Sequence, residues 1–161
     1  MNEDIKKLCK ILSEENFIFK QLLKIETLKN ELIIKQDIEK LKELTEEEKK
    51  YLNNIELKEK ERDLIVDSIF ERYQINNEKV LTVLINNLPE DNKEEIDLIK
   101  KEREELLKNI KDLKKINEIN NKLLSESIKF FNSVIKSLDS SDNITYHRSN
   151  TGKVHLIDQK V

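Results

Sequence analysis

The feature that most restricts the fold of this chain is its near lack of turn-forming residues. It has one proline, Pro89, and one glycine, Gly152, in 161 residues. Glycine and proline end helices and form tight turns, so folds with many strands need many of them. A chain with so few such residues has few places at which it can reverse direction. Long helices are therefore expected, whereas a β-rich or α/β fold is not.

Apolar residues recur with alternating spacings of three and four in three stretches, which we predict to be long helices. These stretches cover about residues 4–34, 46–73 and 92–138. In the last stretch the alternation continues without a slip from Ile96 to Leu138, which is typical of a coiled coil. Because helices joined by short links pack antiparallel, the sequence predicts an all-α fold, an elongated antiparallel three-helix bundle with coiled-coil seams.

Two shorter segments are predicted as accessory helices between the long ones. Residues 38–44 follow Asp37, whose side chain suits a helix N-cap. Thr45 with Glu48 then has the pattern of a capping box, which would start the next helix. Residues 78–88 form the second short helix, which the proline after it ends.

The pattern changes after Leu138, so we divide the chain into a helical bundle, residues 1–138, and a flexible tail, residues 139–161. Two short stretches of the tail, residues 144–148 and 153–157, contain strand-forming residues and flank a polar turn. This pattern is compatible with a small β-hairpin, which is only marginally stable in water on its own. We expect the tail to be mobile unless it packs against something else.

Charge is abundant but balanced, with 30 Lys and Arg against 33 Asp and Glu and a net charge of −3. Because the signs are interspersed, nucleic-acid binding is not expected. Residues 1–12 are unlike a signal peptide, and no run approaches the roughly 20 apolar residues that span a bilayer. Cys9 is the sole cysteine, which excludes an internal disulfide. These features indicate a cytoplasmic protein without stable membrane insertion. Monomer and homodimer both stay open.

Catalytic and metal-binding chemistry find no support in the sequence, so we predict a protein that is not an enzyme and holds no cofactor or metal. His147 and His155 with Asp158 do not complete a metal-ligand set and fit solvated tail residues better. Cys9 lies on an apolar helix face with no histidine nearby in sequence, which favours a small buried side chain over a nucleophile. Gly152 is the only glycine, so a phosphate-binding glycine loop is excluded.

Two charged residues, Glu15 and Arg62, fall on seams that are otherwise apolar. If the first two long helices form a hairpin that turns near residue 40, these side chains lie within a helical turn of each other. They then form either a buried ion pair that fixes helix register or two side chains that reach solvent from a wide seam. The sequence leaves both alternatives open.

The C-terminal part of the last long helix carries more apolar side chains than one seam can bury. That helix also exceeds the first by about fifteen residues, so it should project beyond the bundle at its C-terminal end. An exposed apolar patch of this kind marks a protein-binding surface. The residues predicted to form it are Leu123, Leu124, Ile128, Phe131, Val134, Ile135 and Leu138. The alternative is that the tail or the short helix of residues 38–44 folds over the patch.

Three sequence features follow one another along the chain: Glu14-Glu15 ahead of Leu22-Leu23, then Asn117-x-x-Asn120-x-x-Leu123-Leu124, and finally Thr145-Tyr146 ahead of Gly152. In this combination the chain resembles the FlgN-like flagellar export chaperones, which serve hook-associated proteins. The resemblance covers nearly the whole chain. One departure is that Gly152 follows Tyr146 at a greater distance than the family leads us to expect.

The resemblance implies a cytoplasmic chaperone that binds the hook–filament junction proteins FlgK and FlgL and delivers them to the flagellar type III export gate. It implies that the apolar end of the last helix binds an amphipathic segment of the cargo, in the helix-in-groove mode. It also implies that Tyr146 docks at the gate. The alternative for Tyr146 is packing against Phe130, which would only pin the tail. For the whole protein, the alternative is a structural or scaffolding coiled coil without a delivery role.

Overall fold

The computed structural model describes residues 3–138, and the structural statements below concern that part of the chain. Its elements are α1 (Glu3–Lys35), α2 (Ile38–Arg72), α3 (Leu81–Asn87), a 3-10 turn (Glu90–Asn92) and α4 (Lys93–Leu138). No strand occurs within residues 3–138, so the predicted all-α fold is confirmed. The tail with its possible β-hairpin, residues 139–161, lies outside the described residues.

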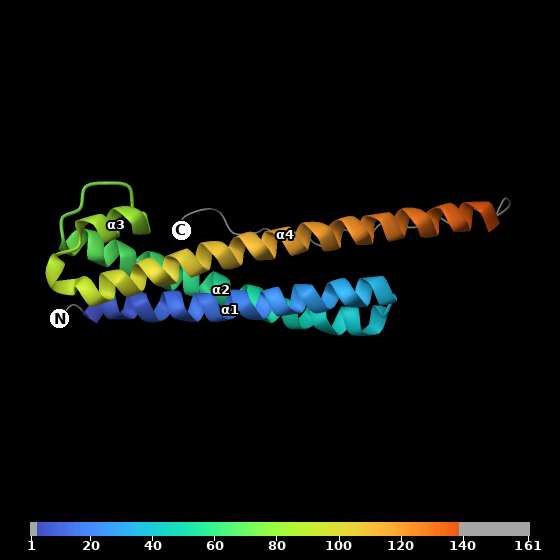
Figure 1. The fold of residues 1–161 in the computed structure, drawn as a ribbon, viewed down its shortest axis with the longest axis horizontal. Coiled ribbons are helices and arrows are strands. Elements are labelled where there is room, and N and C mark those ends of the chain that lie inside the picture. The colour runs from blue at the N-terminus through green and yellow to red at the C-terminus, as the bar shows by residue number, and fades with distance from the viewer. Residues whose placement is uncertain (1–2, 139–161) are drawn as a thin grey trace.

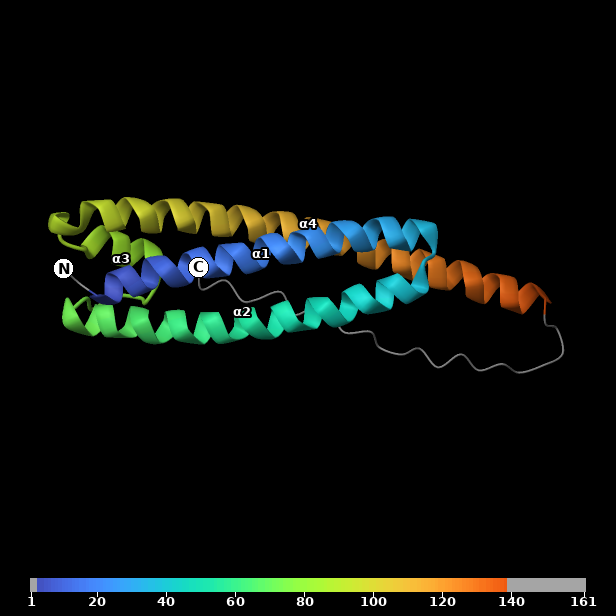
Figure 2. The same ribbon diagram turned by 90° about the horizontal axis from the view of Figure 1, so that it is seen from below.

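The three long helices form an elongated bundle in which α1 is central. Figures 1 and 2 show α1 and α2 as an antiparallel hairpin, with α4 running parallel to α1. The helix α1 packs along both α2 and α4, whereas no Cα atom of α2 comes within 8 Å of one in α4 over the described residues. The short helix α3 contacts both α2 and α4 near the start of α1 (Figure 1). The predicted three-helix bundle is therefore confirmed.

Apolar side chains from all four helices form one core. The predicted seam of α1 is buried, and its partners on the other helices lie mostly in the half of the molecule that contains α3. The largest fully buried side chains are Ile5, Leu8, Leu12, Phe19, Leu22, Ile55, Ile69, Phe70, Leu81, Leu84, Ile99 and Leu106. On α4, the last buried residue is Asn120. The core therefore stops well before α4 does.

The turn between α1 and α2 differs from the prediction. Residues 38–44 are not a separate helix but the first turns of α2, which is continuous to Arg72. Asp37 does cap it, by accepting a hydrogen bond from the Lys40 backbone N–H at 3.2 Å. Thr45 does not start a helix, because its hydroxyl donates to the Leu41 carbonyl at 2.8 Å within α2. The other accessory helix is shorter than predicted, since α3 covers only Leu81–Asn87.

The reason that the capping box fails lies in its second member. Glu48 is buried and accepts a hydrogen bond from Lys29 of α1 at 2.8 Å, so its carboxylate is not available to a backbone N–H at Thr45. The chain instead reverses well before Thr45, at Gln36, which adopts a left-handed conformation with φ of 58°. A tertiary contact thus overrides a local signal.

No helix within residues 3–138 has both the length and the apolar composition needed to cross a membrane.

Candidate functional site

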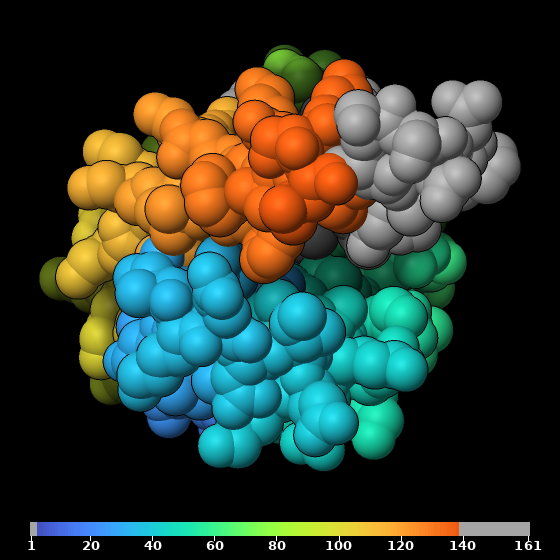
Figure 3. All heavy atoms as spheres, turned by 90° about the vertical axis from the view of Figure 1, so that its right-hand side faces the viewer, coloured from blue at the N-terminus to red at the C-terminus, as the bar shows by residue number. Residues whose placement is uncertain are grey.

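The C-terminal end of α4 projects beyond the rest of the bundle. The helix α4 has 46 residues and α1 has 33, and α4 continues past the turn between α1 and α2 (Figure 1). We call residues 121–138, which follow the last buried residue of α4, the overhang. Seen along the long axis, its side chains form the upper part of this end of the molecule (Figure 3).

The overhang exposes large apolar side chains. Phe130 is 65% exposed, Phe131 49% and Leu138 81%, and Ile128 is exposed as well. Leu123, Leu124, Val134 and Ile135 are half-buried. The rings of Phe130 and Phe131 meet edge-on, with centroids 6.1 Å apart. All seven residues predicted to bind cargo therefore lie on the overhang, and none of them belongs to the core.

Basic side chains accompany this apolar surface. Lys122, Lys129 and Lys136 follow one another at seven-residue spacing, so they lie in one row along α4. Glu126 is the only acidic residue of the overhang. Over the described residues, none of the three lysines lies in an ion pair. The overhang is thus a positively charged, apolar helix end in which no side chain is buried.

The shared part of the bundle, residues 3–120, has a polar interior instead. Arg62 Nη1 of α2 donates to Glu15 Oε2 of α1 at 2.8 Å, and both side chains are almost fully buried. The other carboxylate oxygen, Oε1 of Glu15, is buried with no hydrogen-bond partner. Burial raises the pKa of Glu15 to about 7, although the Arg62 charge opposes that shift. The structure thus brings together the two seam charges that the sequence singled out.

A second buried polar cluster joins all three long helices. Lys29 Nζ donates to Glu26 Oε1 at 2.7 Å and to Glu48 Oε2 at 2.8 Å. Asn120 Nδ2 of α4 donates to the Glu26 carboxylate at 2.7 Å and to its backbone carbonyl at 2.8 Å. Asn30 donates to Asn120 Oδ1 at 3.0 Å. One polar residue of the Asn117-x-x-Asn120 pattern therefore ties α4 to α1.

The charges of this cluster are coupled. Burial and the hydrogen bond with Glu26 raise the pKa of Glu48 to about 7. Burial alone would raise the pKa of Glu26. Its hydrogen bonds with Glu48, Lys29 and Asn120 outweigh burial and hold its pKa below the ordinary value. Burial alone would lower the pKa of Lys29. The carboxylates of Glu26 and Glu48 outweigh burial, so the pKa of Lys29 is raised above its ordinary value. The arrangement therefore favours a protonated Glu48 carboxyl beside an ionised Glu26.

A third polar contact was missed by sequence reasoning. Asn16 Nδ2 donates to the Glu102 backbone carbonyl at 2.9 Å and to the Glu102 carboxylate at 2.7 Å, and Asn109 Nδ2 donates to Asn16 Oδ1 at 3.1 Å. Asn16 lies beside the apolar seam, not on it, so its burial depends on α4 lying parallel to α1. A pattern within one helix carries no signal for such a contact.

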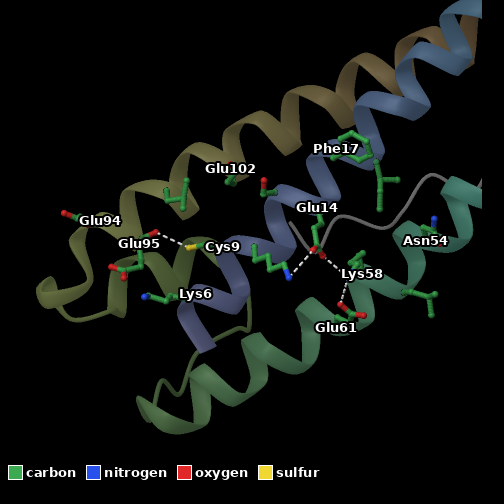
Figure 4. A pocket seen from close by; sticks show the side chains of 15 residues that line it. Lys6, Cys9, Glu14, Phe17, Asn54, Lys58, Glu61, Glu94, Glu95 and Glu102 are labelled. Atoms are coloured by element: carbon green, nitrogen blue, oxygen red, sulfur yellow. Dashed lines mark hydrogen bonds and ion pairs between the residues drawn. The ribbon is translucent and has the colours of Figure 1, made fainter. Parts of the chain in front are cut away.

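On the outer side of α1, a groove of about 1090 Å³ runs between α2 and α4 (Figure 4). Exposed apolar side chains line it from each long helix: Phe17, Leu57 and Leu98. Lys58 of α2 reaches across to Glu14 of α1 at 2.8 Å. The groove is therefore a second apolar surface, and it lies far from the overhang along the long axis of the bundle.

Cys9 also lines the groove, but its environment does not activate it. Its thiol donates to the Glu95 carbonyl at 3.7 Å, and burial raises its pKa to about 11 (Figure 4). A reactive cysteine needs the opposite shift, because the thiolate is the nucleophile. Over the described residues, no group of three or more His, Cys, Asp and Glu side chains is placed to hold a metal ion. Tyr146, His147, His155 and Asp158 lie outside the described residues.

Comparison with known proteins gives one match. The model of the family described as FlgN protein matches residues 1–152 of the chain. Neither the search of curated proteins nor the search of solved structures found a match.

Proposed function

The chain belongs to the FlgN family of flagellar export chaperones, and on that basis we propose that it binds hook–filament junction proteins of the FlgK and FlgL class and delivers them to the flagellar type III export gate. We place this activity in the cytoplasm. The observation that carries the proposal is the overhang, an apolar helix end in which no side chain is buried.

The overhang suits an amphipathic helical segment of the cargo. Phe131 and Leu138 continue the same seam that Leu124 begins, while Ile128 and Ile135 widen it on one side. Burying one large apolar side chain is worth about 1.5–3 kcal/mol, so a few such residues supply the free energy of a specific complex. A terminal helix of the cargo that packs here has its own apolar face covered and no longer self-associates.

The polar interior contributes by holding the bundle in one register. The Glu15–Arg62 pair fixes α1 against α2, and the cluster around Lys29 and Asn120 fixes α1 against α2 and α4. Shifting a helix by one turn would leave buried charges without partners, which is strongly unfavourable. The N-terminal end of the overhang is therefore held in one position relative to the bundle. The apolar surface of the overhang thus keeps a defined orientation.

The experiment that tests cargo binding compares two aspartate substitutions. Phe131→Asp should raise the dissociation constant for a purified FlgK- or FlgL-class protein at least about tenfold. Leu64→Asp is the matched control, because Leu64 is 70% exposed on α2 and distant from the overhang. Melting curves by circular dichroism check that both variants fold. Equal cargo affinity in both variants, or the absence of any complex with the unaltered chain, as a scaffolding coiled coil would show, contradicts the proposal.

For delivery, we propose that Tyr146 docks at the export gate. Tyrosine is favoured at binding hot spots because it combines a large aromatic surface with a hydroxyl group. Tyr146→Ala should reduce secretion of the cargo while cargo affinity and melting temperature stay unchanged. Tyr146→Phe keeps the ring and is the control for its surface. If cargo affinity falls in step with secretion, Tyr146 belongs to cargo binding instead of gate docking.

A further inference from the structure

The groove on the outer side of α1 has one acidic rim. Glu94, Glu95 and Glu102 line it from α4 (Figure 4), and over the described residues none of the three lies in an ion pair. The positive charges of the groove come from the other two helices: Lys6 and Lys10 of α1 and Lys58 of α2. Lys10 pairs with Glu14, and Lys58 pairs with Glu14 and Glu61, so the acidic side chains that line the groove still outnumber the lysines. An occupant that pairs well with the groove therefore combines apolar residues with a row of positive charges next to α4.

Among the described residues, the overhang is such an element. It carries exposed apolar side chains beside Lys122, Lys129 and Lys136, none of which forms an ion pair with another residue of the range 3–138. A chain cannot place its own overhang in its own groove. Leu98 and Phe131 lie on one continuous helix, and the 33 residues between them correspond to about 50 Å. The overhang that fills the groove has to come from a second copy.

We propose that two copies of this chain form an antiparallel homodimer in which the overhang of each copy lies in the groove of the other. The spacing of the charges supports this pairing. When Glu102 of one copy faces Lys129 of the second copy, the seven-residue spacing on both helices also brings Glu95 to face Lys136. Leu98 then falls opposite the turn that carries Phe130 and Val134.

The two surfaces also lie on the same side of the molecule. Glu95, Glu102 and Phe130 are separated by multiples of seven residues, so they share one stripe of α4. Because both surfaces belong to every copy, one two-fold axis creates both contacts at once and closes the assembly as a dimer. The dimer covers part of the surface assigned above to cargo, but it does not depend on that assignment.

The test starts with sedimentation equilibrium of the full chain at increasing protein concentration. The unaltered protein should pass from monomer to dimer, and salt should shift the transition to higher concentration because opposite charges are paired. A chain that remains monomeric at every concentration up to the millimolar range overturns the proposal.

Charge reversal tests the pairing itself. The groove variant Glu95→Lys with Glu102→Lys and the overhang variant Lys129→Glu with Lys136→Glu should each raise the dimer dissociation constant at least about tenfold. Mixing the two variants should restore a dimer, because each reversed surface then meets its reversed partner in both contacts. Glu46→Lys with Lys49→Glu is the matched control, since both residues are exposed on α2 and neither lines the groove.

Melting temperatures separate loss of association from loss of folding, which matters for Glu102 because it accepts a hydrogen bond from Asn16. If Glu102→Lys unfolds the chain, Glu94→Lys with Glu95→Lys replaces it as the groove variant. The proposal is overturned if either reversed variant dimerises as well as the unaltered chain, or if the mixture stays monomeric.

Discussion

The shared part of the bundle and the overhang follow one heptad pattern but use it in opposite ways. In residues 3–120 the seam buries charged and amide side chains, such as Glu15, Lys29 and Asn120, among apolar ones. In residues 121–138 the seam is mostly apolar and none of its side chains is buried. The contrast teaches that periodicity identifies the face of a helix that is to be covered, but not the element that covers it. Polar residues mark where a neighbouring helix is fixed within the chain.

The largest effect should come from breaking the Glu15–Arg62 pair in the shared part. Arg62→Ala leaves a buried carboxylate without its cation, which typically costs about 3–5 kcal/mol of the free energy of unfolding. Urea denaturation followed by circular dichroism measures this cost. Lys60→Ala is the control, because Lys60 pairs with Glu56 on the exposed side of the same helix. Equal losses in the two variants would mean that the buried pair contributes no more to the free energy of unfolding than an exposed pair does.

The next effect is a dependence of stability on pH that also arises in the shared part. Glu15 and Glu48 have pKa values raised to about 7 in the folded protein, from 4.5. The folded state therefore retains protons that the unfolded state releases. The stability from these groups is fully present below pH 4.5 and is lost as the pH rises towards and through 7, by about 3 kcal/mol for a shift of this size.

Urea midpoints measured between pH 5 and pH 8 test this dependence. The midpoint should fall across that interval. Glu15→Gln should remove much of the slope, because glutamine does not titrate. Glu39→Gln, at an exposed position of α2, serves as the control and should leave the slope unchanged. A midpoint that is flat or rises between pH 5 and pH 8 contradicts the assigned pKa shifts.

A smaller effect is expected at the boundary between the two regions. Asn120→Ala removes three hydrogen bonds, two of them buried, and leaves Glu26 without one of its donors, so it should cost about 1–3 kcal/mol. Asn121→Ala, one residue farther, removes only a contact with Asn117 on the same helix and should cost less than about 0.5 kcal/mol. Unfolding free energies of the two variants locate the boundary. Similar losses of unfolding free energy in both variants would show that the shared part of the bundle extends beyond residue 120.

The smallest effect on stability should come from the overhang itself. Phe131→Ala should change the free energy of unfolding of the monomer by less than about 0.5 kcal/mol, because Phe131 is half exposed. Leu106→Ala, on the same helix but fully buried, should cost about 2–5 kcal/mol. Both are measured by urea denaturation at low protein concentration. A large loss for Phe131→Ala would show that the overhang is part of the folded core.

Sequence reasoning reached the features that depend on one helix at a time. It predicted the three long helices, the Asp37 cap and the projection of α4, because spacing, capping and length are properties of a single segment. It missed the continuity of α2 through Thr45, because Glu48 is held by a residue of α1. It also missed Asn16, whose partners Glu102 and Asn109 become neighbours only when α4 lies beside α1.

The central position of α1 has a consequence for the order in which a newly made chain can fold. The contacts of α1 with α2 join residues 19 to 68 positions apart, so the hairpin is complete soon after residue 72 has left the ribosome. The contacts of α1 with α4 span 85 to 94 positions. Until residue 120 emerges, the side of α1 that α4 will cover faces solvent with its apolar and amide groups unmatched. The nascent hairpin is therefore the stage at which this chain is most exposed to aggregation and proteolysis.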